Sequence, residues 1–394
     1  MELFTVAIIC YKNFDFLYDA IDSVLNQNYD SIELIVSDDG SENFPATEVE
    51  EYILSKRSGN VVSFSVIHSE INRGTVRHLN YLIQAATGDY LVFLAGDDAL
   101  YDKNVLSNYV SSFKEAPDNC NILFAQTAMY DHSLQLFQDY YTNSNTIKIL
   151  TQPVDYDELF HMLCISACLP STSTCFRKGF FTQYGLFNED YFLIEDYPLH
   201  IRIAEERIPV YYNNFLAIKH RDGGISHGQV RSVSHSKILY YQDVQKCHDV
   251  VLQKLSNKQL DYKEQIKKNY SHQKVYNDYQ QLGVTRSAFD KLRLFFLHPL
   301  FSIGFILVFL YEHFGKITAK LLIGITGCWI GYPVVVQAIK NVMHINTAVF
   351  VSVVATILEV MWAVLFLLYI IECIGWLIKK INTFPEWLIW TMSY

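Results

Sequence analysis

Several common functional signatures are missing from this chain of 394 residues. None of its eight cysteines belongs to a C-x-x-C pair. The two glycine patterns that cradle phosphate groups, G-x-G-x-x-G and G-x-x-x-x-G-K-[ST], do not occur either. The chain therefore predicts neither a zinc ribbon nor a disulfide framework, and we expect buried free thiols. Since the net charge is −10 and no strongly basic block is present, nucleic acid is not expected as the main partner.

Charged side chains become scarce in the last part of the chain. Residues 294–394 hold five Lys and four Glu, but neither Asp nor Arg. Two apolar runs, at about 317–338 and 347–372, are long enough to cross a bilayer core of about 30 Å as helices. The placement of the lysines favours interfacial positions for the flanking stretches at about 294–314 and 384–394. The tail therefore predicts a membrane region.

The N-terminal part is expected to stay in the cytosol. Met1–Cys10 lacks the pattern of a signal peptide and runs directly into an apolar strand. We therefore expect a first domain at 1–230 on the cytoplasmic side of the plasma or inner membrane. A polar helical linker at 231–293 is expected to join this domain to the membrane region.

Apolar strands alternate with amphipathic helices in the first hundred residues. We expect strands at 5–10, 32–36, 61–68 and 90–95, and helices at 18–25, 48–56 and 77–86. This alternation is typical of an α/β fold with a parallel, doubly wound sheet, to which residues 99–230 add α+β elaborations. Ligands of such sheets bind beyond the carboxyl ends of the strands.

Three pairs of adjacent carboxylates are the candidates for chemistry. Asp38-Asp39 and Asp97-Asp98 each follow an expected strand, and Glu195-Asp196 precedes an expected helix. Two adjacent carboxylates at a strand end are costly unless a cation compensates, and a divalent ion with diphosphate oxygens would do so. An ordinary turn or helix N-cap would use the same residues. Glu195-Asp196 could supply a general base or only complement a helix dipole, so the residues alone leave these alternatives open.

The order of these motifs resembles that of family 2 glycosyltransferases of the GT-A fold. The stretches that carry the resemblance are Val6–Tyr11, Ile32–Ser41, Asn72-Arg73-Gly74, Gly96-Asp97-Asp98, Glu195-Asp196 and the loop Gly223-Gly224-Ile225-Ser226. Together they span roughly residues 4–228. The resemblance implies a doubly wound mixed sheet with a Rossmann-like nucleotide-binding half.

The resemblance also implies an inverting transfer of one sugar from a UDP- or dTDP-sugar with the help of Mg²⁺ or Mn²⁺. Carried over to this chain, the metal ligands would be Asp97 and Asp98, and the general base would be Asp196 with Glu195 beside it. The residues implied around the nucleotide are Tyr11, Asp38, Asp39, Asn72 and Arg73. The acceptor would be a hydroxyl of a lipid-linked saccharide, as in bacterial capsule, exopolysaccharide and O-antigen transferases.

Departures from the family pattern keep other functions open. Ala95 takes the place of the first carboxylate in the common D-x-D-D motif. A further metal ligand could come from Asp222, His220 or His227. The absence of a Q-x-x-R-W motif favours single-sugar transfer over processive synthesis. The alternatives are a polyprenyl-phosphate glycosyltransferase, whose ionised acceptor needs no base, and a catalytically idle GT-A scaffold in a glycan assembly complex.

Overall fold

The computed structural model describes residues 2–165, 168–222, 235–256, 261–282 and 369. The two predicted membrane spans lie outside the described residues, except for Tyr369 in the second. The loop at 223–226 also lies outside them. Within the part of the chain that the structure describes, every helix is too short or too polar to cross a bilayer.

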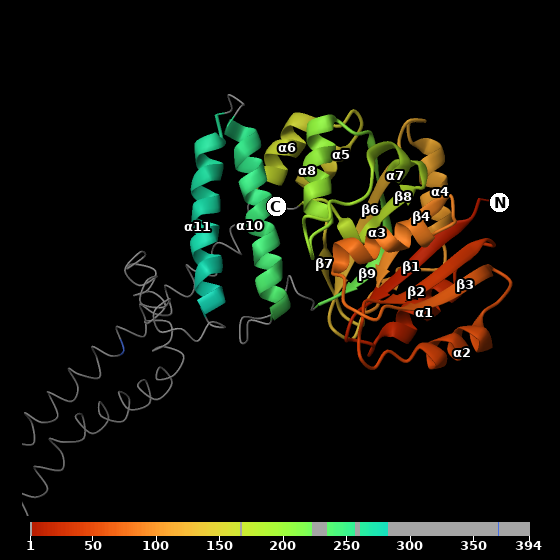
Figure 1. Ribbon diagram of the computed structural model, residues 1–394. Coiled ribbons are helices and arrows are strands. Elements are labelled where there is room, and N and C mark those ends of the chain that lie inside the picture. Colours follow the sequence, from red (N-terminus) through yellow and green to blue (C-terminus); the bar gives the residue numbers. More distant parts are fainter. Residues whose placement is uncertain (1, 166–167, 223–234, 257–260, 283–368, 370–394) are drawn as a thin grey trace, which may run out of the picture. The chain divides into compact units, whose positions relative to one another are not determined.

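Nine strands form one sheet in the described residues (Figure 1): β1 Phe4–Cys10, β2 Ile32–Asp38, β3 Val61–His68, β4 Tyr90–Ala95, β5 Ala99–Leu100, β6 Ile122–Tyr130, β7 Phe137–Tyr140, β8 Thr174–Arg177 and β9 Val210–Arg221. The helices are α1 Leu17–Leu25, α2 Ala46–Lys56, α3 Thr75–Ala85, α4 Val105–Glu115, α5 Ser144–Leu150, α6 Tyr156–Ile165, α7 Gly179–Tyr184, α8 Asp196–Glu206, α10 His235–Ser256 and α11 Lys263–Leu282, with a 3₁₀ turn at Ser171–Ser173. The strands and helices expected in the first hundred residues are confirmed, with ends that differ by at most two residues.

The first half of the sheet is parallel and doubly wound, as the alternation predicted. Its order is β3-β2-β1-β4, and each neighbouring pair is parallel. β8 then lies antiparallel between β4 and β6, and β9 runs parallel to β6. The sheet is therefore mixed, as the resemblance implied. Since two antiparallel steps restore the direction, β9 ends at the same edge of the sheet as β1, β2 and β4.

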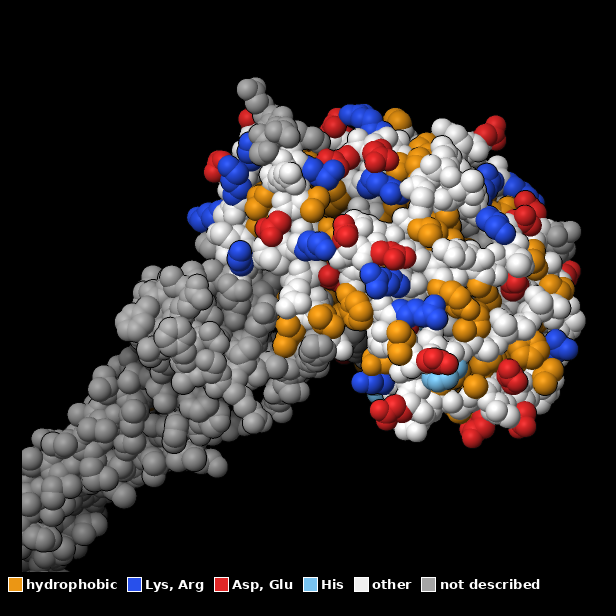
Figure 2. All heavy atoms as spheres, viewed as in Figure 1, with side chains coloured by type: hydrophobic (Ala, Val, Ile, Leu, Met, Phe, Trp, Pro, Cys, Tyr) orange, Lys and Arg blue, Asp and Glu red, His pale blue; other side chains and the backbone are white. Residues whose placement is uncertain are grey.

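Each face of the sheet carries its own apolar core. On β1 the side chains alternate, so that Phe4, Val6 and Ile8 face one core while Ala7 faces the other. The first core is covered by α1, α2 and α4, and the second by α3, α6 and α8. The visible surface is mixed: Figure 2 shows acidic and basic side chains interspersed, with small apolar groups between them. Truncating a fully buried side chain such as Leu34 to alanine should cost about 2–5 kcal/mol.

The region expected as a polar linker contains helices α10 and α11. Both are helical, as predicted, and α10 adds a buried apolar stripe that the prediction did not include. Val244, Cys247, Val251 and Leu255 recur at helical spacing and join the second core. Because Lys, Gln and Tyr surround these residues in the sequence, the stripe is hard to recognise there. The stripe brings α10 against α8.

Candidate active site

The candidate site lies at the edge of the sheet where the parallel strands end. Asp38 is the last residue of β2, and Asp97-Asp98 follow β4. The end of β9 brings His220 and Arg221 to the same edge. Helix α8 packs against β6, with the rings of His200 and Phe124 5.8 Å apart, and leads directly into β9. Its first turn, with Asp196, is therefore also directed toward this edge.

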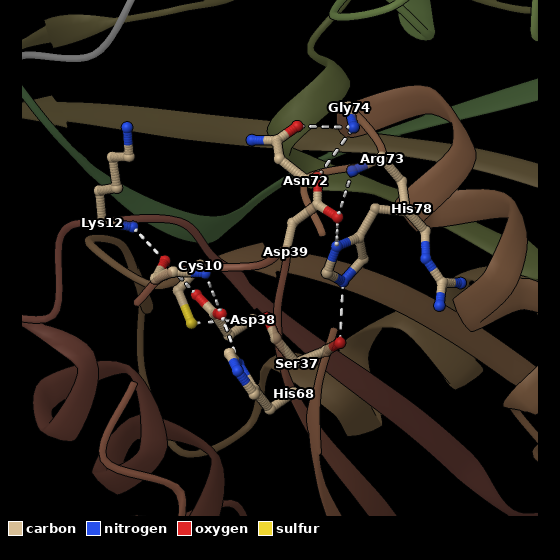
Figure 3. A network of polar contacts seen from close by, with 11 residues as sticks. Cys10, Lys12, Ser37, Asp38, Asp39, His68, Asn72, Arg73, Gly74 and His78 are labelled. Carbon is tan, nitrogen blue, oxygen red and sulfur yellow. Dashed lines mark hydrogen bonds and ion pairs between the residues drawn. The ribbon is translucent and has the colours of Figure 1, made fainter. Parts of the chain in front are cut away.

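Asp38 closes the turn that follows β2 (Figure 3). Its fully buried carboxylate accepts hydrogen bonds from the Ser41 backbone N–H at 2.7 Å and the Ser41 hydroxyl at 2.5 Å. The Nδ1 atom of His68, at the end of β3, lies 2.9 Å from Asp38 Oδ2. The turn needs a glycine, because Gly40 has φ +84° and a Cβ there would lie 2.4 Å from the backbone carbon of Ile71. Asp38 therefore braces the loop.

Asp39 holds the neighbouring loop in the same way (Figure 3). Its carboxylate accepts the backbone N–H groups of Arg73 at 3.0 Å and Gly74 at 2.9 Å. His78 lies 3.1 Å from Asp39 Oδ1 through Nδ1, and its Nε2 is 2.8 Å from Ser37 Oγ. Asp39 is 6% exposed. The pair thus shapes the loop that carries Asn72 and Arg73, two of the predicted donor-binding residues.

Direct contact of these carboxylates with a nucleotide remains a prediction. A carboxylate can accept about four hydrogen bonds. Asp38 already has three polar contacts within the protein, and Asp39 accepts two backbone hydrogen bonds and lies within ion-pair distance of His78. Tyr11, at the end of β1, is 37% exposed and is an available surface for a flat base or sugar. The histidines His68 and His78 were not identified from the sequence, because nothing local relates them to carboxylates that are 30 and 39 positions earlier.

Asp98 and His220 form the centre of the second acidic group. Asp98 is 1% exposed, and its Oδ2 lies 2.8 Å from His220 Nδ1 while its Oδ1 accepts the Arg221 backbone N–H at 3.1 Å. Burial, followed by the charge of Asp98, raises the pKa of Asp97, and His220 and Arg221 offset only part of this rise. Burial lowers the pKa of His220, but the hydrogen bond and charge of Asp98 outweigh it and leave the pKa raised. Both shifts reflect two buried or partly buried carboxylates that lie close together.

Arg221 fixes the loop after β4 and was not identified from the sequence. Its guanidinium donates to the backbone oxygen of Asp97 at 2.6 Å, to that of His132 at 2.7 Å and to the Asp19 carboxylate at 2.6 Å. It also stacks 3.6 Å from the ring centre of Phe16. One buried arginine thus ties together β9, α1, the loop after β4 and the turn after β6. No local sequence signal marks it, because its partners are distant in the chain.

The donor set fits a hard divalent cation. Carboxylate oxygens are the preferred protein ligands of Mg²⁺ and suit Mn²⁺, and such ions commonly take their remaining ligands from substrate phosphates. Burial and the charge of Asp98 raise the pKa of Asp97, and a bound cation would favour its charged form. Within the described ranges, no group of three or more His, Cys, Asp or Glu side chains is arranged to hold a metal. Because carboxylates are the preferred ligands, the residues that would hold a divalent cation are Asp97 and Asp98, with His220 beside them. His227 lies outside the described residues.

The third acidic pair lies at the start of α8. Asp196 Oδ1 accepts the Tyr197 backbone N–H at 2.7 Å. Burial and the charge of Asp196 raise the pKa of Glu195 to about 8. Burial lowers the pKa of His200, one helical turn further on, to about 4. Burial therefore favours the uncharged form of both neighbours of Asp196. No hydrogen bond or ion pair joins Asp196 to Asp97 or Asp98 in the structure as described.

The three predicted groups are connected unequally. The Asp38-Asp39 group contacts the loop 72–74 directly, and a Cβ on Gly74 would lie 2.6 Å from the ring of Phe192. Phe192 lies in the irregular segment that precedes Glu195-Asp196. The loop 72–74 therefore contacts the segment that carries the predicted base, Asp196. The Asp97-Asp98 group is instead connected to β9 and α1 through Arg221.

Comparison with known proteins supports a family 2 glycosyltransferase domain. Residues 5–162 match the model described as Glycosyl transferase family 2. An uncharacterized glycosyltransferase of Rickettsia felis is 25% identical over 219 residues, which are 56% of this chain and 34% of that protein. The uncharacterized glycosyltransferase RT0329 of Rickettsia typhi is 28% identical over 223 residues, 56% of this chain and 64% of that protein. The chain therefore spans from a third to just under two thirds of these relatives.

Solved structures also resemble the chain, at a lower level. The mannosyltransferase PcManGT from Pyrobaculum calidifontis, in complex with GDP-Man and Mn²⁺, is 15% identical, with a TM-score of 0.44 over 72% of each chain.

Proposed function

We propose that this chain is an inverting, metal-dependent glycosyltransferase that moves one sugar from a nucleotide-diphosphate donor to a hydroxyl of a lipid-linked saccharide. Its proposed place is the cytoplasmic face of the plasma or inner membrane, in the synthesis of cell-surface polysaccharide. The family match at 5–162 and the glycosyltransferase relatives support the class of reaction. The apolar runs at 317–338 and 347–372 support an acceptor anchored in the membrane.

The observation that carries the proposal is the group formed by Asp97, Asp98 and His220. Two carboxylates at the end of a parallel strand lie where an α/β sheet binds its ligand. Burial, followed by the charge of Asp98, makes the charge of Asp97 costly and raises its pKa. A bound Mg²⁺ or Mn²⁺ would supply the missing positive charge and would stabilise the charge that develops on the leaving diphosphate.

The chain's own residues would handle the proton. In the proposed reaction the acceptor oxygen attacks the anomeric carbon, a new carbon–oxygen bond forms and the bond to the diphosphate breaks. Asp196 takes the hydroxyl proton on its carboxylate, on the face of the sugar opposite the leaving group, so the configuration inverts. Burial favours the uncharged forms of Glu195 and His200, so these two side chains are less suited than Asp196 to the role of proton acceptor and to that of a charged partner.

The proposal is tested by donor consumption and transfer with the full-length chain in membranes. A panel of UDP-, dTDP- and GDP-sugars is supplied with Mn²⁺, Mg²⁺ or EDTA, together with native lipid extract. The variants are Asp97→Ala and Asp196→Asn, and the exposed Asp118→Ala is the matched control. We expect one donor to be consumed in a metal-dependent way, with both site variants at least about 10²-fold slower and the control unchanged.

Each other outcome selects a different function. Turnover that survives Asp196→Asn but not Asp97→Ala indicates an acceptor that is already ionised, as in a polyprenyl-phosphate glycosyltransferase. Nucleotide binding without consumption of any donor indicates a catalytically idle scaffold. Consumption that is insensitive to EDTA overturns the metal-dependent mechanism.

A further inference from the structure

The segment before Glu195-Asp196 has no regular structure of its own. Tyr191 to Glu195 belong to neither a helix nor a strand, yet they lead directly into the helix that begins with Asp196. A general base must lie within hydrogen-bond reach of the proton that it removes, and a misplacement of about 1 Å can cost about 10²-fold in rate. Something outside the segment must therefore hold it in place.

Asp243, on helix α10, binds this segment through three successive backbone N–H groups. Its Oδ2 accepts from Phe192 at 2.8 Å, from Leu193 at 2.6 Å and from Ile194 at 3.3 Å. Successive N–H groups that converge in this way form a concave anion-binding site. Asp243 is 7% exposed, and a buried carboxylate is tolerated when such charge-assisted hydrogen bonds replace its water. The contact therefore fixes the backbone directly before the acidic pair.

A second residue of α10 supports the same segment. The Lys246 ammonium donates to the backbone oxygen of Asp190 at 2.5 Å and lies 5.3 Å from the ring centre of Tyr191. Asp243 and Lys246 are three positions apart, so they point from one face of the helix. Helix α10 is itself held by its buried apolar stripe, which makes it a firm support.

The other side of the segment is held by the loop that Asp39 shapes. The backbone oxygen of Phe192 accepts the N–H of Val76, at the start of α3, at 3.3 Å. Gly74 has φ +83°, and any Cβ there would meet the Phe192 ring. Since Gly74 N–H is bound by Asp39, a continuous set of contacts runs from Asp39 through Gly74 and Phe192 to Asp243.

We propose that Asp243 is a positioning residue that sets the direction of Asp196 by fixing the backbone at 192–194. This role rests on the proposed function, in which Asp196 removes the acceptor proton. Asp243 itself touches neither substrate in this proposal. Its loss should slow acceptor attack while leaving the donor pocket at the ends of β2 and β4 intact.

Hydrogen exchange tests the structural half of the proposal without any assay of activity. In the full-length chain, the amides of 192–194 should exchange slowly although they lie outside regular structure. Asp243→Asn removes the negative charge with almost no change in shape, and it should speed exchange in peptides that cover 190–196 by at least about 10-fold. Asp249→Asn makes the same change at an exposed position of α10 and should have no effect at 190–196. Fast exchange at 192–194 in the unaltered chain overturns the proposal, even if a variant fails to fold.

Kinetics test the other half. For Asp243→Asn we expect kcat for transfer to fall about 10- to 100-fold, with the donor KM changed by less than twofold. Lys246→Ala, which keeps Asp243, should show the same pattern with a smaller loss. If Asp243→Asn lowers donor affinity, the rate of transfer and thermal stability together, the role of Asp243 is structural and the proposal is wrong. If exchange responds as expected but no form of the chain consumes a donor, the proposed function is wrong. The role of Asp243 in fixing the backbone at 192–194 would still hold.

Discussion

The ends of β2 and β4 carry the same two residues in two different environments. After β2, Asp38 and Asp39 are enclosed by Ser41, His68, His78 and the loop 73–74, and each carboxylate has three polar contacts within the protein. After β4, burial and then the charge of Asp98 raise the pKa of Asp97, and His220 and Arg221 offset only part of this rise. The first pair is satisfied by the fold. In the second pair Asp98 is bound by His220 and the Arg221 N–H, and Asp97 is the carboxylate whose charge the proposed cation would stabilise.

This difference shows how a carboxylate that braces a loop can be separated from one that serves a ligand. A satisfied carboxylate should contribute to stability, because each charge-assisted hydrogen bond is lost on unfolding. An incompletely compensated carboxylate should contribute to activity and little to stability, since the fold gains nothing from its charge. Matched Asp→Asn substitutions at the two strand ends should therefore separate activity from stability.

The largest expected effect is on activity at the end of β4. Asp97→Asn should lower transfer by about 10²–10⁴-fold, because one charged ligand of the cation is lost. Its thermal stability should be unchanged or higher, since the substitution removes a buried charge that is repelled by Asp98. Initial rates at saturating Mn²⁺ and a thermal melt without metal measure the two effects. A large loss of stability would mean that Asp97, like Asp38 and Asp39, mainly stabilises the fold.

The next largest effect is on stability at the end of β2. Asp38→Asn should lower the free energy of unfolding by about 2–3 kcal/mol, because its amide nitrogen cannot accept the hydrogen bonds that Oδ1 or Oδ2 accepts. Denaturant unfolding of the full-length chain measures it, and Asp118→Asn, at an exposed position, is the control. An unaltered midpoint together with a large loss of donor affinity would instead favour direct nucleotide contact, as the family resemblance implied.

The sequence predicted the first half of the fold well. The strands at 61–68 and 90–95 have the predicted ends, because their apolar runs are bounded by turn residues on both sides. The resemblance implied a mixed sheet but not the antiparallel strand β8, since the four residues Thr174–Arg177 carry no periodic signal. The six cysteines in the described residues are free and buried, as expected from their apolar surroundings.

The candidate site was predicted by its acidic pairs and not by their partners. A pair of aspartates after a strand is visible locally, whereas the partners that distinguish the two pairs are distant in sequence. Asp98 meets His220 after 122 positions, and Phe192 meets Asp243 after 51. Arg221 shows no motif at all. These contacts form because the folded chain brings β9 and α10 next to residues that are distant in sequence, and no local pattern predicts such an arrangement.

The last prediction concerns the third acidic pair and the pH dependence of stability. Burial and the charge of Asp196 raise the folded-state pKa of Glu195 to about 8, above its ordinary value of 4.5. The folded state therefore binds this proton more tightly than the unfolded state, so stability falls as the pH rises from about 4.5 to about 8. Glu195→Gln cannot ionise and should lose this part of the slope. Thermal melts of both forms at intervals from pH 5 to pH 9 should diverge in favour of Glu195→Gln as the pH rises. Parallel curves would mean that Glu195 ionises as easily in the folded chain as in water, and that this pair, like Asp38-Asp39, has its charge satisfied by the fold.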